Sequence, residues 1–455
     1  MALGFERAGG RCIGAVDSDP AAGETLKRLF EPEGAVVFSG PGSGKDPGGD
    51  LTRLQPEQLL ARLPSAPDVV VGGPPCQGFS RIGRAKQRSL VDRRSWTLTR
   101  TLDPERDALY LSFLDLVSVA RPRAFVMENV PSMRELGHGG DVANRIATTA
   151  ERCGYNVRYF LLNAAWYGVP QHRWRLFFVG LRSDLGHEAV PAPPRRTHDA
   201  APLLPEGLGE PEDPRMIAAT AVPAQRRLQN ATTVAEAIGD LPRLRAHLKG
   251  QEAVDEPLPL RREPSAWVAQ LRSWPGRRAS RLVTGSWYRS TPRDYRIFQA
   301  MAHGDRYPQA LEIAQALFGE RIAELRSEGI APKPGSRAYE SLRKRYVPPY
   351  RNDAFDDKWA KLHPQRPSWT VTAHLSRDAY SHIHYDSTQA RTITVREAAR
   401  LQSFPDSVEF SGSRGDQFRQ IGNAVPPLLG YAIAKQLFKQ LRALVPSTRR
   451  ARAIA

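Results

Sequence analysis

Apolar runs alternate with amphipathic segments over the first 182 residues of the chain. Runs with the length and the β-branched or aromatic content of strands lie at 12–19, 68–73, 124–130, 154–164 and 175–181. Segments with helical spacing of apolar residues lie at 21–30 and 108–120. Strands that alternate with helices predict an α/β domain, built on a parallel sheet with helices on both faces. Val69–Val71 and Phe125–Met127 are continuously apolar, so we expect both strands to be covered on both sides.

The pattern changes beyond this region. A proline-rich stretch at 191–214 predicts a linker or loop. Up to about residue 364 the periodicity is weaker, and arginine alternates with Trp and Tyr in clusters such as SWYRSTPRDYR. Such clusters suit phosphate contacts and base stacking, although a solvated surface explains any single one.

Regular structure returns near the C-terminus. Thr394 and Glu397 predict a capping box that opens a helix. Pro426 and Pro427 suit the first turn of a last helix. Its apolar residues recur every four positions and predict one buried face, made of Leu429, Ile433, Leu437 and Leu441.

Composition limits the kinds of partner and the cellular compartment that we expect for this protein. The 455 residues carry a formal net charge of +17, which suits a polyanion, either nucleic acid or an anionic membrane surface. No apolar run approaches the roughly 20 residues that a membrane span needs, and the N-terminus does not resemble a secretion signal. The three cysteines, Cys12, Cys76 and Cys153, make neither a disulfide framework nor a metal-ligand spacing. We therefore expect a cytoplasmic protein without a metal.

Cys76 lies in a turn directly after an apolar run, in the sequence VVVGGPPCQGFS at 69–80. Ligands of open α/β sheets bind at the carboxyl ends of strands, so a thiol here faces a site. The neighbouring glycines permit close approach of a ligand, and the two prolines stiffen the turn. An isolated cysteine is more often a small buried apolar residue, but the turn favours a functional thiol.

Three charged residues lie at the ends of other predicted strands. Glu128 ends the run AFVMENV, where a carboxylate is costly unless it is paired or binds a ligand. Arg173 and Arg175 open a strand and, with a period of two, project to one face. A salt bridge to a helix and an edge-strand charge pair are the structural alternatives. Together with Cys76, these residues suggest covalent catalysis on an electron-poor ring.

Two acids are candidates for a nucleotide-like cofactor. Asp17 ends a predicted strand, where acids commonly accept hydrogen bonds from ribose hydroxyls. Asp50 is a candidate for an adenine amino group. Each signal is weak alone, because acids also cap helices.

Together these motifs resemble those of the DNA cytosine-C5 methyltransferases. The matching segments occur in the order of that family and are GGPPCQGFS at 72–80, MENV at 127–130, QHRWR at 171–175, TVREAARLQSFPD at 394–406 and QIGNAVPP at 420–427. The resemblance implies a Rossmann-like S-adenosylmethionine-dependent methyltransferase sheet with a second, smaller target-recognition domain. We place the catalytic domain at 1–182, the linker and target-recognition domain at 183–411, and a C-terminal motif with a helix returning to the catalytic domain at 412–455.

The resemblance also implies a mechanism. A cytosine of double-stranded DNA is flipped into the site, and the Cys76 thiolate attacks its C6. Glu128 holds N3 and the exocyclic amino group, and Arg175 contacts O2 with Arg173 beside it. The loop from Ser80 to about Arg106 closes over the base. The positions that answer to cofactor contacts are Asp17, Ser18, Asp50, Leu51, Pro75, Leu109 and Asn423.

The resemblance implies a monomer acting on DNA, with restriction or phage-defence proteins as candidate partners that the sequence does not decide. Two alternatives stay open: the same chemistry on tRNA, which the long basic segment 183–390 disfavours, and a catalytically impaired DNA-binding relative. Family members begin with a strand and a Gly-rich cofactor loop before the residues that answer to Leu3–Gly10. We expect either a start codon upstream, which the intact motifs favour, or a chain that binds S-adenosylmethionine poorly.

Overall fold

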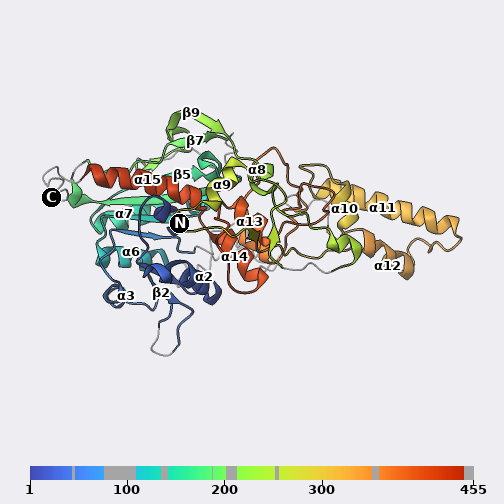
Figure 1. Cartoon of the computed structure of the whole chain (residues 1–455), viewed down its shortest axis with the longest axis horizontal. Helices are drawn as coiled ribbons and strands as arrows, with labels where there is room; N and C mark the ends of the chain where they lie inside the picture. Colours follow the sequence, from blue (N-terminus) through green and yellow to red (C-terminus); the bar gives the residue numbers. More distant parts are fainter. Residues whose placement is uncertain are drawn as a thin grey trace, which may run out of the picture. The chain divides into compact units, whose positions relative to one another are not determined.

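The computed structural model describes residues 1–43, 47–75, 109–134, 142–186, 188–200, 213–251, 256–350 and 358–444. The chain forms two compact units (Figure 1). Unit 1 comprises Met1–Ala231 and Val425–Ala455, and unit 2 comprises Thr232–Ala424. The divisions thus fall after residues 231 and 424, whereas the sequence pattern places them after 182 and 411.

A five-stranded mixed sheet organises unit 1, in the order β3-β4-β6-β5-β8. Its strands are β3 (Val69–Gly72), β4 (Ala124–Asn129), β5 (Tyr155–Asn163), β6 (Trp174–Arg182) and β8 (Met216–Ile217). The prediction of a parallel sheet is wrong at β6, which runs antiparallel to both β4 and β5. Only residues 164–173 join β5 to β6, and a parallel crossover needs a dozen residues or more.

A separate parallel pair is formed by β1 (Gly14–Asp17) and β2 (Val36–Ser39). The helix between them, α2 (Pro20–Phe30), begins at Asp19, whose carboxylate accepts hydrogen bonds from the backbone N–H groups of Ala21 and Ala22. Val16 of β1 and Val70 of β3 pack against the same apolar cluster, made of Phe38, Leu54, Leu59 and Leu116.

The two strands expected to be fully covered differ in burial. Every residue of β4 is buried, and Phe125, Val126 and Met127 are 0% exposed. Every residue of β3 is only partly buried, contrary to expectation. Within the described parts of the chain β3 pairs with β4 alone, so its other edge receives no ladder partner.

The remaining regular elements of unit 1 include one strand pair that the sequence pattern did not predict. The region expected to be a linker contains β7 (Arg196–Asp199), which pairs with β9 (Ala224–Asn230). The helices are α1 (Ala2–Arg7), α3 (Pro56–Arg62), α6 (Leu109–Ala120), α7 (Val142–Arg152) and α15 (Pro427–Ala443). Short 3₁₀ turns lie at Glu31–Glu33, Pro131–Arg134, Ala164–Tyr167, Ser183–Leu185 and Ala219–Ala221.

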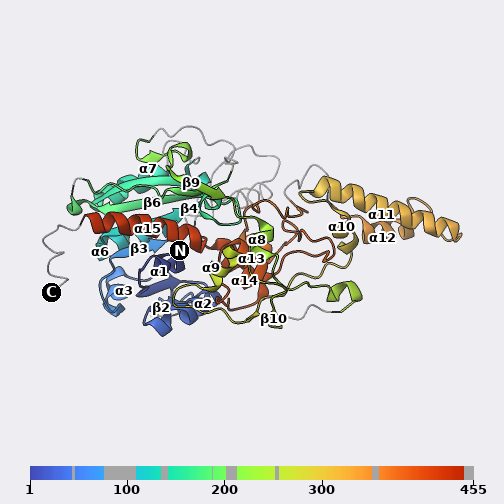
Figure 2. The ribbon, with the colours of Figure 1, turned by 45° about the horizontal axis from the view of Figure 1, so that its top comes forward.

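The last helix belongs to the same unit as the first. Helices α1 and α15 lie side by side, as Figures 1 and 2 both show. Gly4 lies at their crossing, where a Cβ atom would stand 2.3 Å from the backbone nitrogen of Tyr431. The predicted apolar face of α15 is confirmed, because its four residues are buried, namely Leu429, Ile433, Leu437 and Leu441.

The regular elements of unit 2 are mainly helices. Its helices are α8 (Val234–Ile238), α9 (Ala266–Arg272), α10 (Tyr295–Ala300), α11 (Tyr307–Ser327), α12 (Arg337–Tyr346), α13 (Val395–Leu401) and α14 (Arg414–Asn423), with 3₁₀ turns at Ala246–Lys249 and Ala373–Ser376. A short antiparallel pair joins β10 (Leu258–Pro259) to β11 (Leu282–Val283). Phe298, Tyr307 and Trp359 centre an aromatic contact group in its core.

Candidate active site

Glu128 and Arg175 form an ion pair at the ends of two neighbouring strands. The Nε atom of Arg175 lies 2.8 Å from Oε1 of Glu128, and both side chains are largely buried, at 14% and 11% exposure. The antiparallel register of β4 and β6 pairs Asn129 with Leu176, so Arg175 lies one position past the end of β4. Two residues that are distant in the sequence are thereby brought together.

Arg173 lies one residue before β6 and is only 1% exposed. Its backbone is held by Asn163 and Ala164: its N–H donates to Oδ1 of Asn163 at 3.2 Å, and its carbonyl accepts from the N–H of Ala164 at 2.9 Å. The structure therefore fixes the backbone of Arg173 in the turn before β6, while Arg175 of that strand pairs with Glu128.

The electrostatics of the three residues are coupled. Burial lowers the pKa of Arg175, and the ion pair with Glu128 opposes this change. Burial and the charge of Arg175 lower the pKa of Arg173 well below its ordinary value, while Glu128 raises it. Two buried guanidinium groups beside one carboxylate make a site suited to an acceptor that carries partial or full negative charge.

The turn that leads to Cys76 is tied to the same strand ends. The side-chain amide of Asn129 donates to the carbonyl of Pro74 at 3.2 Å. Asn129 was missed in the sequence, although it directly follows Glu128. Cys76 itself, and the loop from Ser80 to about Arg106, lie outside the described residues. The described chain thus holds the turn to residue 75 beside Glu128.

Gly72 and Gly73 in this turn leave space for side chains of the protein itself. A Cβ atom on Gly72 would lie 2.7 Å from the ring of Phe113, and one on Gly73 would lie 3.0 Å from Oε2 of Glu128. At both positions the space that glycine leaves is filled by a side chain of the protein. That they also permit close approach of a ligand stays a prediction.

The residues expected to bind a cofactor are spread over several elements. Asp17 ends β1, and its Oδ1 accepts from the N–H of Asp19 at 2.8 Å. Gly49 packs over the end of β1, where a Cβ atom would lie 2.1 Å from the carbonyl oxygen of Asp17, so Asp17 and Asp50 lie near one another in unit 1. Oδ1 of Asp50 accepts from both the N–H and the hydroxyl of Thr52, which closes a local turn.

The other expected cofactor residues differ in exposure. Ser18 and Pro75 are exposed, whereas Leu51 packs against the apolar cluster around Leu59. Leu109 is the first residue of α6. Asn423 is exposed and is the last residue of α14, so it belongs to unit 2.

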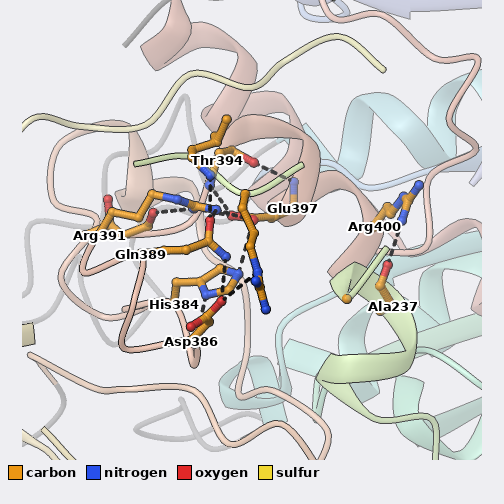
Figure 3. A network of polar contacts seen from close by, with 12 residues as sticks. Ala237, His384, Asp386, Gln389, Arg391, Thr394, Glu397 and Arg400 are labelled. Carbon is orange, nitrogen blue, oxygen red and sulfur yellow. Dashed lines mark hydrogen bonds and ion pairs between the residues drawn. The ribbon is translucent and has the colours of Figure 1, made fainter. Parts of the chain in front are cut away.

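A second buried polar cluster occupies unit 2 (Figure 3). The predicted capping box is confirmed: Thr394 accepts from the N–H of Glu397, and the Glu397 carboxylate accepts from the N–H of Thr394. The same carboxylate receives two bonds from Arg391, at 2.7 and 2.8 Å. Gln389 links Arg391 to the backbone N–H of Leu244. Glu397 therefore joins a helix start to a segment from the early part of unit 2.

His384 extends this cluster as a neutral ring. Its Nδ1 accepts from the N–H of Asp386 at 2.9 Å, and its Nε2 lies 3.4 Å from Oε1 of Glu397. Burial lowers its pKa, against the opposing effect of Glu397. The neutral ring with a proton on Nε2 satisfies both contacts.

Arg400 forms a similar buried junction one turn later on α13. It donates to the carbonyl of Ala237 and to Asp240 in the early part of unit 2, and to Asp406 beyond the helix. Asp406 also accepts from Arg272 at 2.8 Å. The charged residues of the segment at 394–406 thus hold separate parts of unit 2 together.

The described residues contain no group of three or more His, Cys, Asp or Glu side chains placed to hold a metal ion. Nor does any helix within the described ranges have the length and apolar character needed to cross a membrane.

Comparison with known proteins identifies the family. A family model described as C-5 cytosine-specific DNA methylase matches residues 1–439. The chain is 37% identical over 401 residues to M.OihORF3336P of Oceanobacillus iheyensis, whose name classes it as a type II methyltransferase, covering 86% of this chain and 84% of the relative. It is 31% identical over 404 residues to the type II methyltransferase M.AgeI of Thalassovita gelatinovora, covering 85% and 87%.

A third relative and one solved structure agree with this assignment. The DNA (cytosine-5-)-methyltransferase M.ApeKI of Aeropyrum pernix is 27% identical over 432 residues, covering 83% of this chain and 82% of the relative. A crystal structure of a prophage-encoded DNA modification methyltransferase from E. coli matches with a TM-score of 0.58 and 20% identity over 97% of this chain and 96% of that chain, which shows a shared fold. The chain belongs to the C-5 cytosine-specific DNA methylase family and is a DNA (cytosine-5-)-methyltransferase.

Proposed function

We propose that this enzyme transfers a methyl group from S-adenosylmethionine to C5 of a cytosine flipped out of double-stranded DNA, through a covalent bond between Cys76 and C6. The observation that carries the proposal is the buried Glu128–Arg175 pair beside Arg173, at the strand ends where the turn to Cys76 is tied by Asn129. A flipped base is required because C6 cannot be reached inside a stacked duplex.

Each residue of the site has a separate proposed role in the reaction at the cytosine ring. Addition of the Cys76 thiolate forms the S–C6 bond and moves the electrons of the C5–C6 double bond toward C5, with negative charge spreading to O2 and N3. Arg175, with Arg173 beside it, stabilises that charge at O2, and Glu128 holds N3 and the exocyclic amino group. The electron pair at C5 forms the bond to the methyl group that the bound cofactor would supply. Loss of the C5 proton to water and departure of the thiolate then restore the ring.

The residues around the ends of β1 and β2 fit the proposed cofactor in part. The Asp17 carboxylate at a strand end suits ribose hydroxyls, and Leu51 offers an apolar surface for a purine. Asp50 fits an adenine amino group less well, because its Oδ1 is already used by Thr52. Ser18, Pro75, Leu109 and Asn423 are proposed as further contacts. The bound cofactor supplies the electrophilic methyl group.

We further propose a modification role beside a restriction or phage-defence enzyme, with this enzyme acting as a monomer in the cytoplasm. The support is that M.OihORF3336P and M.AgeI both carry type II methyltransferase names. Unit 2, with its clusters of arginine and aromatic residues, is the proposed target-recognition part.

Bisulfite sequencing of DNA from cells that express the enzyme tests the proposal. We expect 5-methylcytosine at one recurring sequence, and its absence from cells that express Cys76→Ala. Cys153→Ala is the matched control, because Cys153 is a free, partly buried cysteine of unit 1 and should leave methylation intact. Methylation of tRNA instead of duplex DNA, or activity of Cys76→Ala, would contradict the proposal.

A duplex with 5-fluorocytosine at the methylated position supplies a second readout. Fluorine cannot leave as the proton does, so the adduct should persist as a denaturation-resistant complex. No trapped complex in the presence of S-adenosylmethionine would exclude the covalent route.

A further inference from the structure

Helices α11 and α12 form a hairpin with an apolar seam. Figures 1 and 2 both show the two helices side by side. Three residues of α12 spaced three and four positions apart face α11: Tyr339, Leu342 and Tyr346. The ring of Phe318 on α11 lies 5.2 Å from that of Tyr339 and 6.2 Å from that of Tyr346. The opposite face of α12 is left to solvent.

That solvent face is strongly basic. From 333 to 345 the sequence holds five cationic residues and one carboxylate, Glu340. All five cationic side chains are exposed: Lys333, Arg337, Arg343, Lys344 and Arg345. Helix α11 is less basic, since three exposed carboxylates, Glu312, Glu320 and Glu324, stand against exposed Arg326 and against Arg321, which pairs with Glu324. The excess of positive charge therefore lies on α12.

Helix stability alone does not explain the position of these charges. Cations in the last turn of a helix interact favourably with its dipole, which accounts for Arg343, Lys344 and Arg345. Arg337 is the first residue of α12, where the same dipole makes a cation unfavourable. Glu340 is 3.9 Å from Arg343 in an exposed pair, which contributes little.

We propose that the basic face of α12 binds the phosphate backbone of the DNA substrate outside the target sequence, and so sets affinity without reading bases. The inference rests on the proposed function. Arg337 and Lys344 are seven positions apart and lie on one face over about 10 Å of helix, and Arg345 flanks that face. A duplex carries about one negative charge per 1.7 Å of its axis over both strands, so each of the three cations can meet a phosphate.

The test measures the salt dependence of DNA binding without cofactor, by fluorescence anisotropy from 50 to 200 mM NaCl. We expect the triple variant R337Q/K344Q/R345Q to lower the slope of log affinity against log salt by about 2 to 3, because each phosphate contact contributes about 0.9. Affinity for the target duplex and for an unrelated duplex should fall by the same factor. The charge-preserving variant R337K/R345K should keep the slope, since a point charge suffices for a phosphate.

A triple variant of another helix controls for total charge. K435Q/K439Q/R442Q removes three exposed cations at spacings of four and three on α15 of unit 1. An equal loss of slope in this control would overturn the proposal, as would an unchanged slope in the α12 variant. Loss of affinity for the target duplex alone would assign α12 to base recognition and also overturn it. Methyl transfer by the unaltered enzyme is measured separately. Failure of the proposed function can therefore be distinguished from failure of the α12 proposal.

Discussion

At the scale of single residues, the site depends on a charge that is buried with its partner. The Glu128 carboxylate balances a guanidinium that has little access to water. Breaking such a pair by removing one partner is far more costly than losing an exposed pair, because the remaining charge stays buried.

Glu128→Gln should lower the single-turnover rate of methyl transfer at least about 100-fold, since it removes the carboxyl group proposed to hold N3 and leaves Arg175 unpaired. It should also lower the melting temperature. The matched control is Asp184→Asn, which breaks the more exposed Arg182–Asp184 pair and should change neither rate nor stability appreciably. A rate for Glu128→Gln equal to that of the control would remove Glu128 from the chemistry.

Glu397 makes stability depend on pH. Burial alone would raise its pKa, but Arg391 and His384 lower it more, so its pKa in the folded protein is well below the ordinary value of 4.5. A depressed folded pKa gives stability that is complete above pH 4.5 and is lost as pH falls through the folded value.

Glu397→Gln should therefore unfold at lower denaturant concentration at pH 7, with a loss of about 3 to 5 kcal/mol, because Arg391 loses its buried partner. Below about pH 4.5 its unfolding free energy should fall less steeply than that of the unaltered enzyme, by up to about 1.4 kcal/mol per pH unit. Urea titrations between about pH 3 and pH 7 measure both. Parallel pH profiles for the two proteins would show that the pKa of Glu397 is the same in the folded and unfolded states.

At the scale of elements, the crossing of α1 and α15 tolerates no side chain. A Cβ atom on Gly4 would meet three backbone atoms within 2.6 Å, on Pro427, Gly430 and Tyr431. Backbone cannot move aside as a flexible side chain can, so the two helices would have to separate.

Gly4→Ala should destabilise the protein by about 1 to 3 kcal/mol or more, as overpacking does. Gly319→Ala is the matched control, because Gly319 sits inside α11 and a Cβ atom there would have nothing within 4 Å. That change should stabilise by about 0.5 to 1 kcal/mol, through helix propensity. Thermal unfolding measures the melting temperature of both variants. Equal changes in melting temperature would refute the close crossing of α1 and α15.

At the scale of the whole molecule, the chain leaves unit 1 at Ala231 and re-enters it at Val425. A cut placed by sequence pattern alone, at 215–365, would remove β8 and β9, which pair with strands of unit 1. It would also remove Asp240, an ion-pair partner of Arg400. The unit boundaries are the sounder places to divide the protein.

Replacement of Thr232–Ala424 by a flexible linker should leave a cooperatively folding unit 1 that binds DNA without sequence preference. The reason is that the sheet and α15 remain whole, while the proposed recognition part is gone. Circular dichroism melting and the ratio of affinities for target and unrelated duplexes measure the two expectations. A ratio equal to that of the full chain would place recognition in unit 1.

Local sequence was enough to predict most of the elements of unit 1 and to indicate the family. Alternating apolar runs placed β1, β3, β4, β5 and β6 and the last helix, because hydrophobic periodicity and capping are local properties. The segments around Cys76, Glu128 and Arg175 also pointed to the family that the comparisons show. These inferences needed only neighbouring residues and their order.

Which of these residues meet became visible only in the folded chain. The direction of β6, the part-exposed β3 and the pairing of Glu128 with Arg175 follow from how distant strands align. The crossing at Gly4 and the link from Glu397 through Arg391 and Gln389 to Leu244 likewise join segments far apart in sequence. Such contacts depend on three-dimensional packing and leave no local pattern in the chain, so single segments do not reveal them.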